Sequence, residues 1–439
     1  MIRLLIFLLL VSLTYAKDPL PRGPQFGAQL RPATDAELLA VNQPFGQGLV
    51  LPMILPNSSA ADGGLEVGDI LLTADGKALQ TSADLTGLIK ELGPGAKVKL
   101  ELMRGSKKLS KSVTLKERPR ETSEEFEILH DAVNIDGHLR RVVFTKPHGE
   151  GPFPLVVLCP GLGCYSVDPL AASMESYKEI LWELTRQGFA TLRVEFTGMG
   201  DSQGPPCAEM SFYDEVHGFV EALKQLDKFK FADKQRIIAF GHSMGGLVGP
   251  YISTEIPLVG IVALNTSAID WSEYELINQR RQMLLAKSPY DSIEIAAHLK
   301  LQALYLLGYS GQSADEIIAA HPELAEYLQY PVHPRFIKDL VLNNPGALWQ
   351  KATGRVLFIQ GTSDFVTAPE EHQYGVDLIN SFRPGTAEFV TIDDMDHFMF
   401  RQPDQQASFD NMISGMPNKE FNRDIVKVVV DWCRAVAMR

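Results

Sequence analysis

Cysteine is scarce in this chain, with four residues in 439. Four cysteines are too few for a small scaffold held together by several disulfides. Their spacing does not match a zinc site, and the sequence contains no His-Glu-x-x-His motif. We therefore expect no metal and no cofactor. Cys159 ends an apolar strand-like run and Cys433 lies in an amphipathic segment, where buried thiols are common, whereas Cys164 and Cys207 lie in loop-like segments. A disulfide is predicted between Cys164 and Cys207.

An excess of positive charge is also missing. The formal net charge is -13 and the isoelectric point is near 5.3. Nucleic acids and anionic membranes bind basic surfaces, which displace the counterions of the polyanion. The composition therefore excludes a nucleic-acid partner, although it does not name the partner that the protein has.

Long apolar runs are absent beyond the first residues. Residues 1–16, MIRLLIFLLLVSLTYA, place Arg3 before the apolar run Leu4–Val11 and end in small or polar residues. This pattern is typical of a cleavable secretory signal, and the run is much shorter than the roughly 20 residues that span a bilayer. A membrane anchor is the alternative. We predict a secreted or periplasmic protein with no transmembrane anchor after signal cleavage.

Residues 27–116 form a block of short apolar strands, glycine-rich turns and one helix, which a charged linker, 117–124, joins to the rest. Leu49–Leu55 is predicted to be the first long strand, Gly68-Asp69 turns into a second, and Asp75-Gly76 makes a tight turn. The stretch GLVLPMILPNSSAADGGLEVGDILLTADGKAL carries these features in order. It resembles a PDZ domain of the bacterial kind.

A C-terminal peptide, held as an added strand beside the helix, is the ligand that this resemblance implies. Its carboxylate is expected near the glycine-rich loop formed by Gly46, Gln47, Gly48 and Leu49. Pro52 lies in the strand that would pair with the peptide, and proline lacks the N–H that such pairing uses. Peptide capture and a role in packing or positioning therefore both stay open.

Residues 125–439 change to apolar strands that alternate with helices, which predicts an α/β domain with a mostly parallel sheet covered on both faces. An antiparallel hairpin is expected around Asp136-Gly137. The predicted strands are 126–133, 139–145, 155–159, 190–196, 236–240, 259–264, 356–359 and 388–392, and the predicted helices are 173–187, 212–226, 246–255, 370–380 and 421–437.

The strongest chemical signal is RIIAFGHSMGGLVG, in which an apolar strand runs into Gly241-His242-Ser243-Met244-Gly245 and then into a helix. A sharp strand-to-helix turn strains the serine backbone, and the flanking glycines avoid clashes there. This pattern resembles the nucleophile elbow of G-x-S-x-G hydrolases. An incidental turn is the alternative, but the strand and the helix on its two sides favour Ser243 as a nucleophile.

A serine hydroxyl needs a base to take its proton and an acid to orient that base. Asp364 follows one predicted strand in GTSDFVTAP, and His397 follows the next in DDMDHFMF. The order Ser, Asp, His is the one expected for this kind of hydrolase. The rival acids are Asp393, Asp394 and Asp396, and the rival bases are His242, His298, His321, His333 and His372.

The oxyanion of an acyl-transfer intermediate needs main-chain donors. The N–H of Met244, directly after the nucleophile, is one candidate. The other is expected in the loop that follows the strand Leu155–Cys159, where Pro160 precedes Gly161-Leu162-Gly163. By resemblance to the His-Gly-x loops of related hydrolases, Leu162 takes the donor position, with Pro160 in place of the His.

Together these motifs resemble a serine hydrolase of the α/β-hydrolase superfamily, with an N-terminal PDZ-like domain. The resemblance implies that the insertion at about 266–353, whose amphipathic segments include 274–286 and 314–320, forms a helical cap over the active site. Its alternative is a surface subdomain. Trp271, Tyr274, Met283, Leu284 and Leu285 would give a partly apolar entrance, but helix packing on the core would give the same pattern.

The function implied is hydrolysis of a carboxylic ester or related acyl bond of a small-molecule or peptide substrate, through an acyl-enzyme. We favour esterase over peptidase chemistry, although no residue decides between ester and amide. A serine peptidase or an acyltransferase would use the same triad. The alternative of another class is a PDZ-based binding protein on a non-catalytic hydrolase scaffold.

Overall fold

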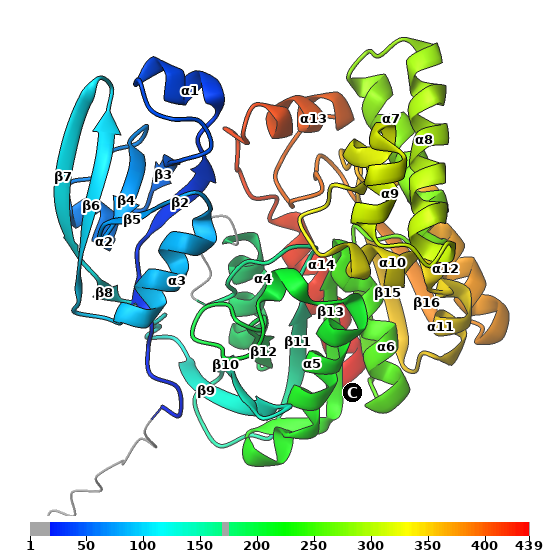
Figure 1. The fold of residues 1–439 in the computed structure, drawn as a ribbon. Coiled ribbons are helices and arrows are strands. Elements are labelled where there is room, and N and C mark those ends of the chain that lie inside the picture. The colour runs from blue at the N-terminus through cyan, green and yellow to red at the C-terminus, as the bar shows by residue number, and fades with distance from the viewer. Residues whose placement is uncertain (1–17, 169–174, 439) are drawn as a thin grey trace, which may run out of the picture.

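The computed structural model describes residues 18–168 and 175–438. The predicted signal segment, 1–16, and the first two residues of the predicted helix 173–187 lie outside the described residues. Figure 1 shows a small β-rich region on one side of a larger α/β region. Within the described ranges, no helix is both long and apolar enough to cross a bilayer.

The N-terminal region contains a six-stranded antiparallel sheet, in which five strands follow in the order β2-β3-β4-β6-β7 and β5 pairs with β4. Its apolar side chains form their own core, with Leu49, Leu71 and Leu100 fully buried. It has three helices where the sequence analysis expected one. The elements are β1 Pro24–Gln25, β2 Ala28–Pro32, α1 Asp35–Ala40, β3 Leu49–Ile54, α2 Ser59–Asp62, β4 Ile70–Ala74, β5 Lys77–Ala78, α3 Ser82–Leu92, β6 Lys97–Arg104, β7 Lys107–Thr114 and β8 Lys116–Glu117.

The large region is built on one eight-stranded sheet in the order β16-β15-β14-β13-β11-β12-β10-β9. Its first two strands form the predicted antiparallel hairpin, and the other six run parallel. The strands are β9 Glu127–Ile135, β10 His138–Lys146, β11 Phe153–Cys159, β12 Ala190–Val194, β13 Ala232–His242, β14 Gly260–Leu264, β15 Arg355–Gly361 and β16 Ala387–Ile392. Because the strands are parallel, their carboxyl ends share one edge of the sheet.

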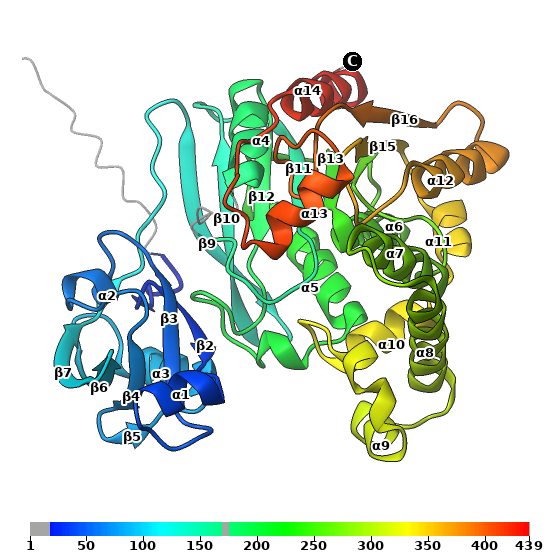
Figure 2. The same cartoon turned by 90° about the horizontal axis from the view of Figure 1, so that it is seen from above.

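Helices cover both faces of this sheet (Figure 2). One face packs against α4 Glu175–Arg186 and α14 Asp424–Ala437. The other packs against α5 Phe212–Lys224, α6 Val248–Glu255 and α12 Pro369–Phe382. Burial on both faces explains why the central strands are continuous apolar runs without alternation.

The interval after β14 forms a set of helices, as the insertion pattern predicted. They are α7 Trp271–Leu285, α8 Tyr290–Tyr309, α9 Ala314–Ala320, the 3₁₀ segment η5 Pro322–Leu328, α10 Pro334–Leu342 and α11 Pro345–Lys351. Trp271 and Tyr274 pack into the core, so they do not form an exposed entrance, whereas Leu284 is 62% exposed. A further helix, α13 Gln405–Ile413, contacts α7 and was not predicted.

A buried ion cluster joins the two regions. Arg22, just before β1, pairs with Asp168 and with Asp201, whose carboxylate is 2.6 Å from the guanidinium, and all three side chains are almost fully buried. Arg141 of β10 bonds the same Asp201 carboxylate at 3.2 Å. The charged linker also docks rather than remaining solvated, because Arg193 pairs with Glu121 at 2.6 Å.

Replacing Arg22 by alanine is expected to destabilise the large region by about 3–5 kcal/mol, because two buried carboxylates lose a shared cation. All four tryptophans lie beyond residue 125, so their fluorescence during urea unfolding reports on that region. Lys427→Ala is the control: the ion pair of Lys427 with Asp431, on α14 Asp424–Ala437 of the large region, is solvent-exposed, so a change below about 1 kcal/mol is expected. Equal effects of the two variants would contradict this role of the cluster.

Candidate active site

Ser243 stands at the turn from β13 into a helical segment, η4 Ser243–Leu247, that leads into α6. Its backbone φ is +55°, in the left-handed region that strains a residue with a side chain. Gly245 makes the turn possible, because a Cβ there would lie 2.0 Å from the carbonyl oxygen of Cys159. Sterics therefore explain this glycine of the G-x-S-x-G motif.

The three residues predicted as a triad come together at the carboxyl edge of the sheet. The Nε2 atom of His397 is 3.0 Å from the Oγ atom of Ser243. The Nδ1 atom of the same ring is 3.0 Å from the Oδ2 atom of Asp364. Both contacts are within hydrogen-bond reach, the geometry that a base between a nucleophile and an orienting acid requires.

Asp364 is fully buried and well supplied with donors. Its carboxylate accepts hydrogen bonds from the N–H groups of Val366 and Thr367, and from the Thr367 hydroxyl at 2.6 Å. Burial alone would raise the pKa of Asp364, but the neighbouring His397 and these hydrogen bonds bring it below its ordinary value. The carboxylate is therefore ionised at neutral pH and can hold an Nδ1–H donor in place.

The rival groups are occupied elsewhere. The carboxylate of Asp396 accepts the N–H groups of Phe398 and Phe400, so it shapes the loop that carries His397. The ring of His242 contacts the main-chain carbonyl of His397, not Ser243. His372, on α12, is fully buried, and its ring accepts the N–H of Thr266 and contacts the carbonyl of Ala368.

A hydrogen-bonded chain that no sequence motif signals connects the loops around the triad. The Nε2–H of His242 donates to the carbonyl of His397 at 2.7 Å. The Nδ1 atom of His242 accepts a hydrogen bond from the hydroxyl of Tyr177 at 2.6 Å. That hydroxyl accepts the N–H of Gly161 at 3.2 Å. Burial, together with the nearby His397, lowers the pKa of His242 to about 3, so the ring stays neutral at neutral pH. Tyr177 lies within a helix, where its residue type alone gives no signal of this role.

The loop after β11 lies against the nucleophile, as the oxyanion prediction requires. A Cβ at Gly161 would be 3.4 Å from the Cβ of Ser243. The N–H of Leu162 makes no hydrogen bond to any residue that the structure describes, so it is available to a ligand. Met244 directly follows the nucleophile at the start of η4. Both main-chain candidates are therefore near Ser243.

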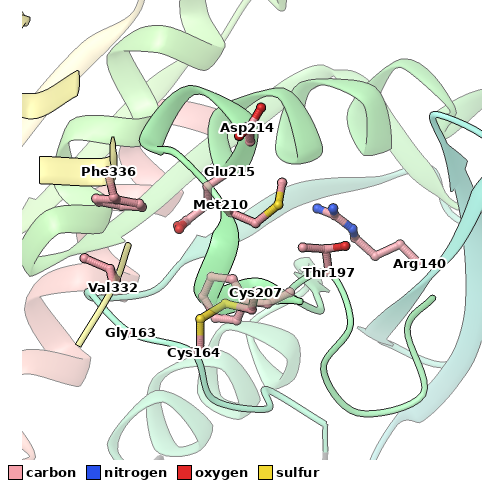
Figure 3. A pocket seen from close by; sticks show the side chains of 11 residues that line it. Arg140, Gly163, Cys164, Thr197, Cys207, Met210, Asp214, Glu215, Val332 and Phe336 are labelled. Atoms are coloured by element: carbon pink, nitrogen blue, oxygen red, sulfur yellow. A yellow bond between two sulfur atoms is a disulfide. The ribbon is translucent and has the colours of Figure 1, made fainter. Parts of the chain in front are cut away.

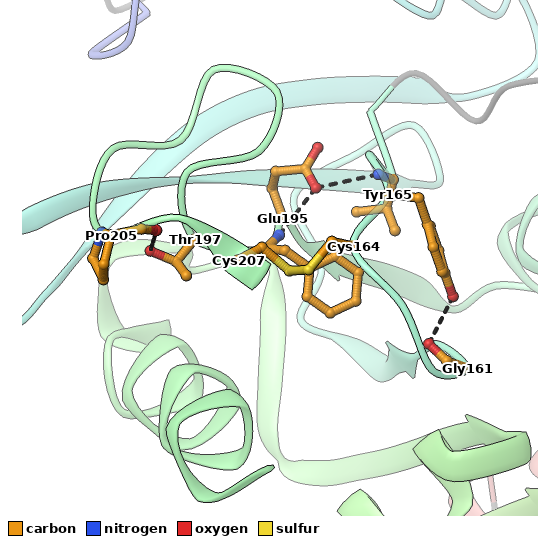
Figure 4. The surroundings of a disulfide bond; sticks show 9 residues. Gly161, Cys164, Tyr165, Glu195, Thr197, Pro205 and Cys207 are labelled. Carbon is orange, nitrogen blue, oxygen red and sulfur yellow. Dashed lines mark hydrogen bonds between the residues drawn. A yellow bond between two sulfur atoms is a disulfide. The ribbon is translucent and has the colours of Figure 1, made fainter. Parts of the chain in front are cut away.

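The predicted disulfide between Cys164 and Cys207 is present, with a Cα–Cα distance of 5.8 Å. It ties the loop after β11 to a short 3₁₀ segment, η2 Cys207–Glu209 (Figure 4). In the same view, the hydroxyl of Tyr165 donates to the carbonyl of Gly161 at 2.9 Å. Cys159 and Cys433 are free and buried, as expected.

Glu195, just after β12, is a buried carboxyl group beside this loop. It accepts hydrogen bonds from the Ser166 hydroxyl and from the N–H groups of Val167 and Phe196. Burial raises its pKa from 4.5 to about 7, although these hydrogen bonds act against the shift. The folded protein therefore holds a proton that the unfolded chain releases near pH 4.5.

This shift makes stability depend on pH. Between pH 4.5 and 7 the folded state binds more protons than the unfolded state, so stability falls as pH rises. Relative to Glu195→Gln, which cannot titrate, the wild type should lose about 3 kcal/mol of unfolding free energy between pH 4.5 and 8. Urea unfolding of both proteins across this range measures the difference. A difference that is constant with pH would show that Glu195 is not protonated in the folded state.

The structure corrects the predicted peptide groove of the N-terminal region. The strand Leu49–Ile54 lies between β2 and β4, so it has no free edge with which a peptide could pair. In the predicted carboxylate loop of Gly46, Gln47, Gly48 and Leu49, the Gly48 N–H already donates to the carbonyl of Leu79 at 2.7 Å. The edge strand beside α3 is β2.

The comparisons with known proteins agree with this architecture. The model of the alpha/beta hydrolase family matches residues 156–409, more than half of the chain, and the PDZ domain model matches residues 24–115. Esterase EstD of Thermotoga maritima is 22% identical over 288 residues, which cover 65% of this chain and 64% of that esterase.

A further relative and a solved structure also match the chain. A probable periplasmic serine endoprotease, DegP-like, of Pseudomonas savastanoi pv. phaseolicola is 38% identical over 89 residues, covering 20% of this chain and 18% of that protein. The solved structure of Est1E from Butyrivibrio proteoclasticus with ferulic acid covers 70% of this chain and 99% of its own, at 14% identity and a TM-score of 0.45. The chain thus spans less than two thirds of the curated relatives that it matches. On the family match and the sheet described above, this chain belongs to the alpha/beta hydrolase family and carries an N-terminal PDZ domain.

Proposed function

We propose that this protein is an exported serine esterase in which Ser243, His397 and Asp364 act as the catalytic triad. The observation that supports this most is the pair of 3.0 Å contacts that His397 makes with Ser243 and Asp364. The similarity to Esterase EstD favours an ester as the substrate. The reaction is carboxylic-ester hydrolysis through an acyl-enzyme.

In the first half-reaction, His397 takes the proton of Ser243 while Oγ attacks the ester carbonyl carbon. The oxyanion accepts hydrogen bonds from the N–H groups of Leu162 and Met244. The C–O bond to the alcohol then breaks, and His397 returns its proton to the leaving oxygen. Water repeats the sequence on the acyl-enzyme, which releases the acid and restores Ser243.

Export rests on three observations. Residues 1–16 have the charge, apolar run and small-residue end of a secretory signal. The relative that matches the PDZ region is named as periplasmic. A disulfide between Cys164 and Cys207 also suits an oxidising compartment. We therefore propose a periplasmic or secreted location.

A panel of p-nitrophenyl esters of graded acyl length, beside aminoacyl p-nitroanilides, tests the proposed chemistry. We expect the esters to be hydrolysed with a kcat/KM at least 100-fold above that of the anilides. Faster cleavage of an anilide would favour a serine peptidase, and products formed with added alcohol would favour an acyltransferase. No turnover of any compound would favour a binding protein.

The PDZ domain supports a second role, capture of a C-terminal peptide. The edge strand β2 beside α3 is the place where an added strand can pair. Fluorescence anisotropy with a labelled peptide library tests this. We expect binding that is lost when the terminal carboxylate is amidated; equal binding of both forms would exclude this mode.

A further inference from the structure

Arg140, on β10, is a buried guanidinium without a partner. It is 8% exposed, and it makes no hydrogen bond or ion pair within residues 18–168 and 175–438. Other buried arginines of this chain, Arg22, Arg141 and Arg193, each pair with a carboxylate. Burial lowers the pKa of Arg140 against the charges of Glu215, Asp136 and Glu195, so carboxyl groups are near but do not bond to it. Because the guanidinium lines a cavity and bonds no carboxylate, it is available to an anionic ligand.

The fold makes specific room for this guanidinium. Gly218 of α5 lies against it, and a Cβ at Gly218 would be 2.1 Å from the Nη1 atom of Arg140. Glycine is less favourable than alanine inside a helix, so its presence here fits a need for space. The neighbouring helix α5 therefore leaves the space that the guanidinium occupies.

Two adjoining cavities share Arg140, Thr197, Met210 and Asp214 in their walls. The outer one is an open cleft of 350 Å³, within the size range of small-ligand sites. The inner one is narrower and reaches Gly163 and Cys164 in the loop after β11. Figure 3 shows the guanidinium of Arg140 pointing from its strand toward Met210.

A second unpartnered group faces the inner cavity. The Oε1 atom of Glu215 is buried without a hydrogen-bond partner in the described chain, and Glu215 lines this cavity. Burial raises the pKa of Glu215 to about 8, in spite of the charge of Arg140. At neutral pH the group is a neutral carboxylic acid, so it can donate its O–H to an acceptor.

Most other charges of the outer cleft are engaged, although the carboxylate of Glu209 also lines it. The ring of His217 pairs with Asp136 at 3.1 Å, and Asp214 accepts the N–H of Ser211. Arg335 donates to the main-chain carbonyl of Glu209. Because acidic side chains are at least as numerous as cations here, a doubly charged phosphate is disfavoured, whereas one carboxylate matches one free guanidinium.

We propose that a carboxylate group binds where the two cavities adjoin, held by the guanidinium of Arg140, which lines both cavities, and by the side chain of Glu215, which lines the inner one. Gly161 lies against Ser243, and Gly163 lies within about 8 Å of Gly161 because successive Cα atoms are 3.8 Å apart. The inner cavity, lined by both Arg140 and Gly163, thus lies between the guanidinium and the loop beside the nucleophile, so the group that binds there is a free carboxylate of the substrate itself. This last step rests on the proposed function: the preferred ester carries a second, ionised carboxyl group.

The test compares p-nitrophenyl hemiglutarate and hemiadipate with the neutral pentanoate and hexanoate esters. In the wild type we expect the charged esters to have the higher kcat/KM. In Arg140→Gln the ratio of charged to neutral kcat/KM should fall about 10- to 100-fold, the effect of losing one hydrogen-bonded charge contact. Arg335→Gln, in the same cleft but already bonded to main chain, is the control and should keep the ratio within threefold.

Gly218→Ala gives an independent variant, because it displaces the guanidinium without removing its charge, and it should lower the same ratio. An unchanged ratio in both Arg140→Gln and Gly218→Ala would overturn the substrate form of the proposal. Calorimetric titration of the Ser243→Ala protein with free glutarate, with and without Arg140→Gln, then shows whether the bound carboxylate belongs to the substrate or to a separate ligand. Arg140-dependent binding without ester preference assigns the carboxylate to a separate ligand, and it would support the site even if no ester is hydrolysed. Absence of both binding and preference overturns the site.

Discussion

Replacing Ser243 by alanine is expected to lower kcat for the best ester by about 10⁶-fold, because no covalent acyl-enzyme can form without the hydroxyl. The loss should be in kcat rather than in KM, since the contacts of the bound substrate remain. Initial rates with the preferred p-nitrophenyl ester measure it. The variant should retain the fold, because the substitution removes only the hydrogen bond between Ser243 Oγ and His397, and Ser243 is half-buried.

Ser253→Ala provides the matched control. Ser253 is a buried serine of α6, whose hydroxyl donates to the carbonyl of Pro250 at 2.7 Å. It is outside the proposed chemistry, so its loss should leave kcat within about threefold of the wild type. A Ser243→Ala protein that keeps more than a hundredth of the wild-type kcat would show that another group attacks the ester.

Asp364→Asn should lower kcat by about 10⁴-fold, because an amide no longer selects the ring tautomer in which Nε2 can accept the serine proton. The shape of the site should hold, since the side-chain oxygen of asparagine can still accept the N–H groups of Val366 and Thr367. The same ester assay measures the loss. A loss of this size in kcat would identify Asp364 as the orienting acid, because a residue that only stabilises a turn would cause a smaller loss.

Asp396→Asn tests the neighbouring acid. Asp396 is buried next to His397 in sequence, but its carboxylate bonds main-chain N–H groups and not the imidazole. Its substitution should therefore lower kcat less than 100-fold, through a loosened loop. A larger loss for Asp396→Asn than for Asp364→Asn would reverse the assignment of the orienting acid.

The sequence was sufficient for the parts of the site that lie on regular elements. Ser243, Asp364 and His397 each follow an apolar run, and parallel strands bring their carboxyl ends to one edge, so convergence could be inferred from strand order in the chain. The pair Cys164 and Cys207 was also predictable, because the other two cysteines lie in apolar segments.

Other features depend on spatial neighbours that a single sequence does not reveal. The short strand β2, Ala28–Pro32, has mostly exposed or half-buried residues and gives little apolar signal, so the edge of the PDZ sheet was assigned to the wrong strand. The contact of Tyr177 with His242 joins a helix to a strand end 65 residues away. Arg140 and Arg141 are adjacent and chemically identical in sequence, yet among the described residues only Arg141 forms ion pairs with carboxylates.

Active-site labelling of the folded protein with a fluorophosphonate tests the central claim most directly. Such a probe reacts with a serine whose hydroxyl is activated by a base, and peptide mass spectrometry locates the adduct. We expect one adduct, on the peptide that contains Ser243, that is lost on urea unfolding and in a His397→Ala variant. An unlabelled Ser243 in folded protein, or labelling that survives His397→Ala undiminished, would contradict the proposed esterase.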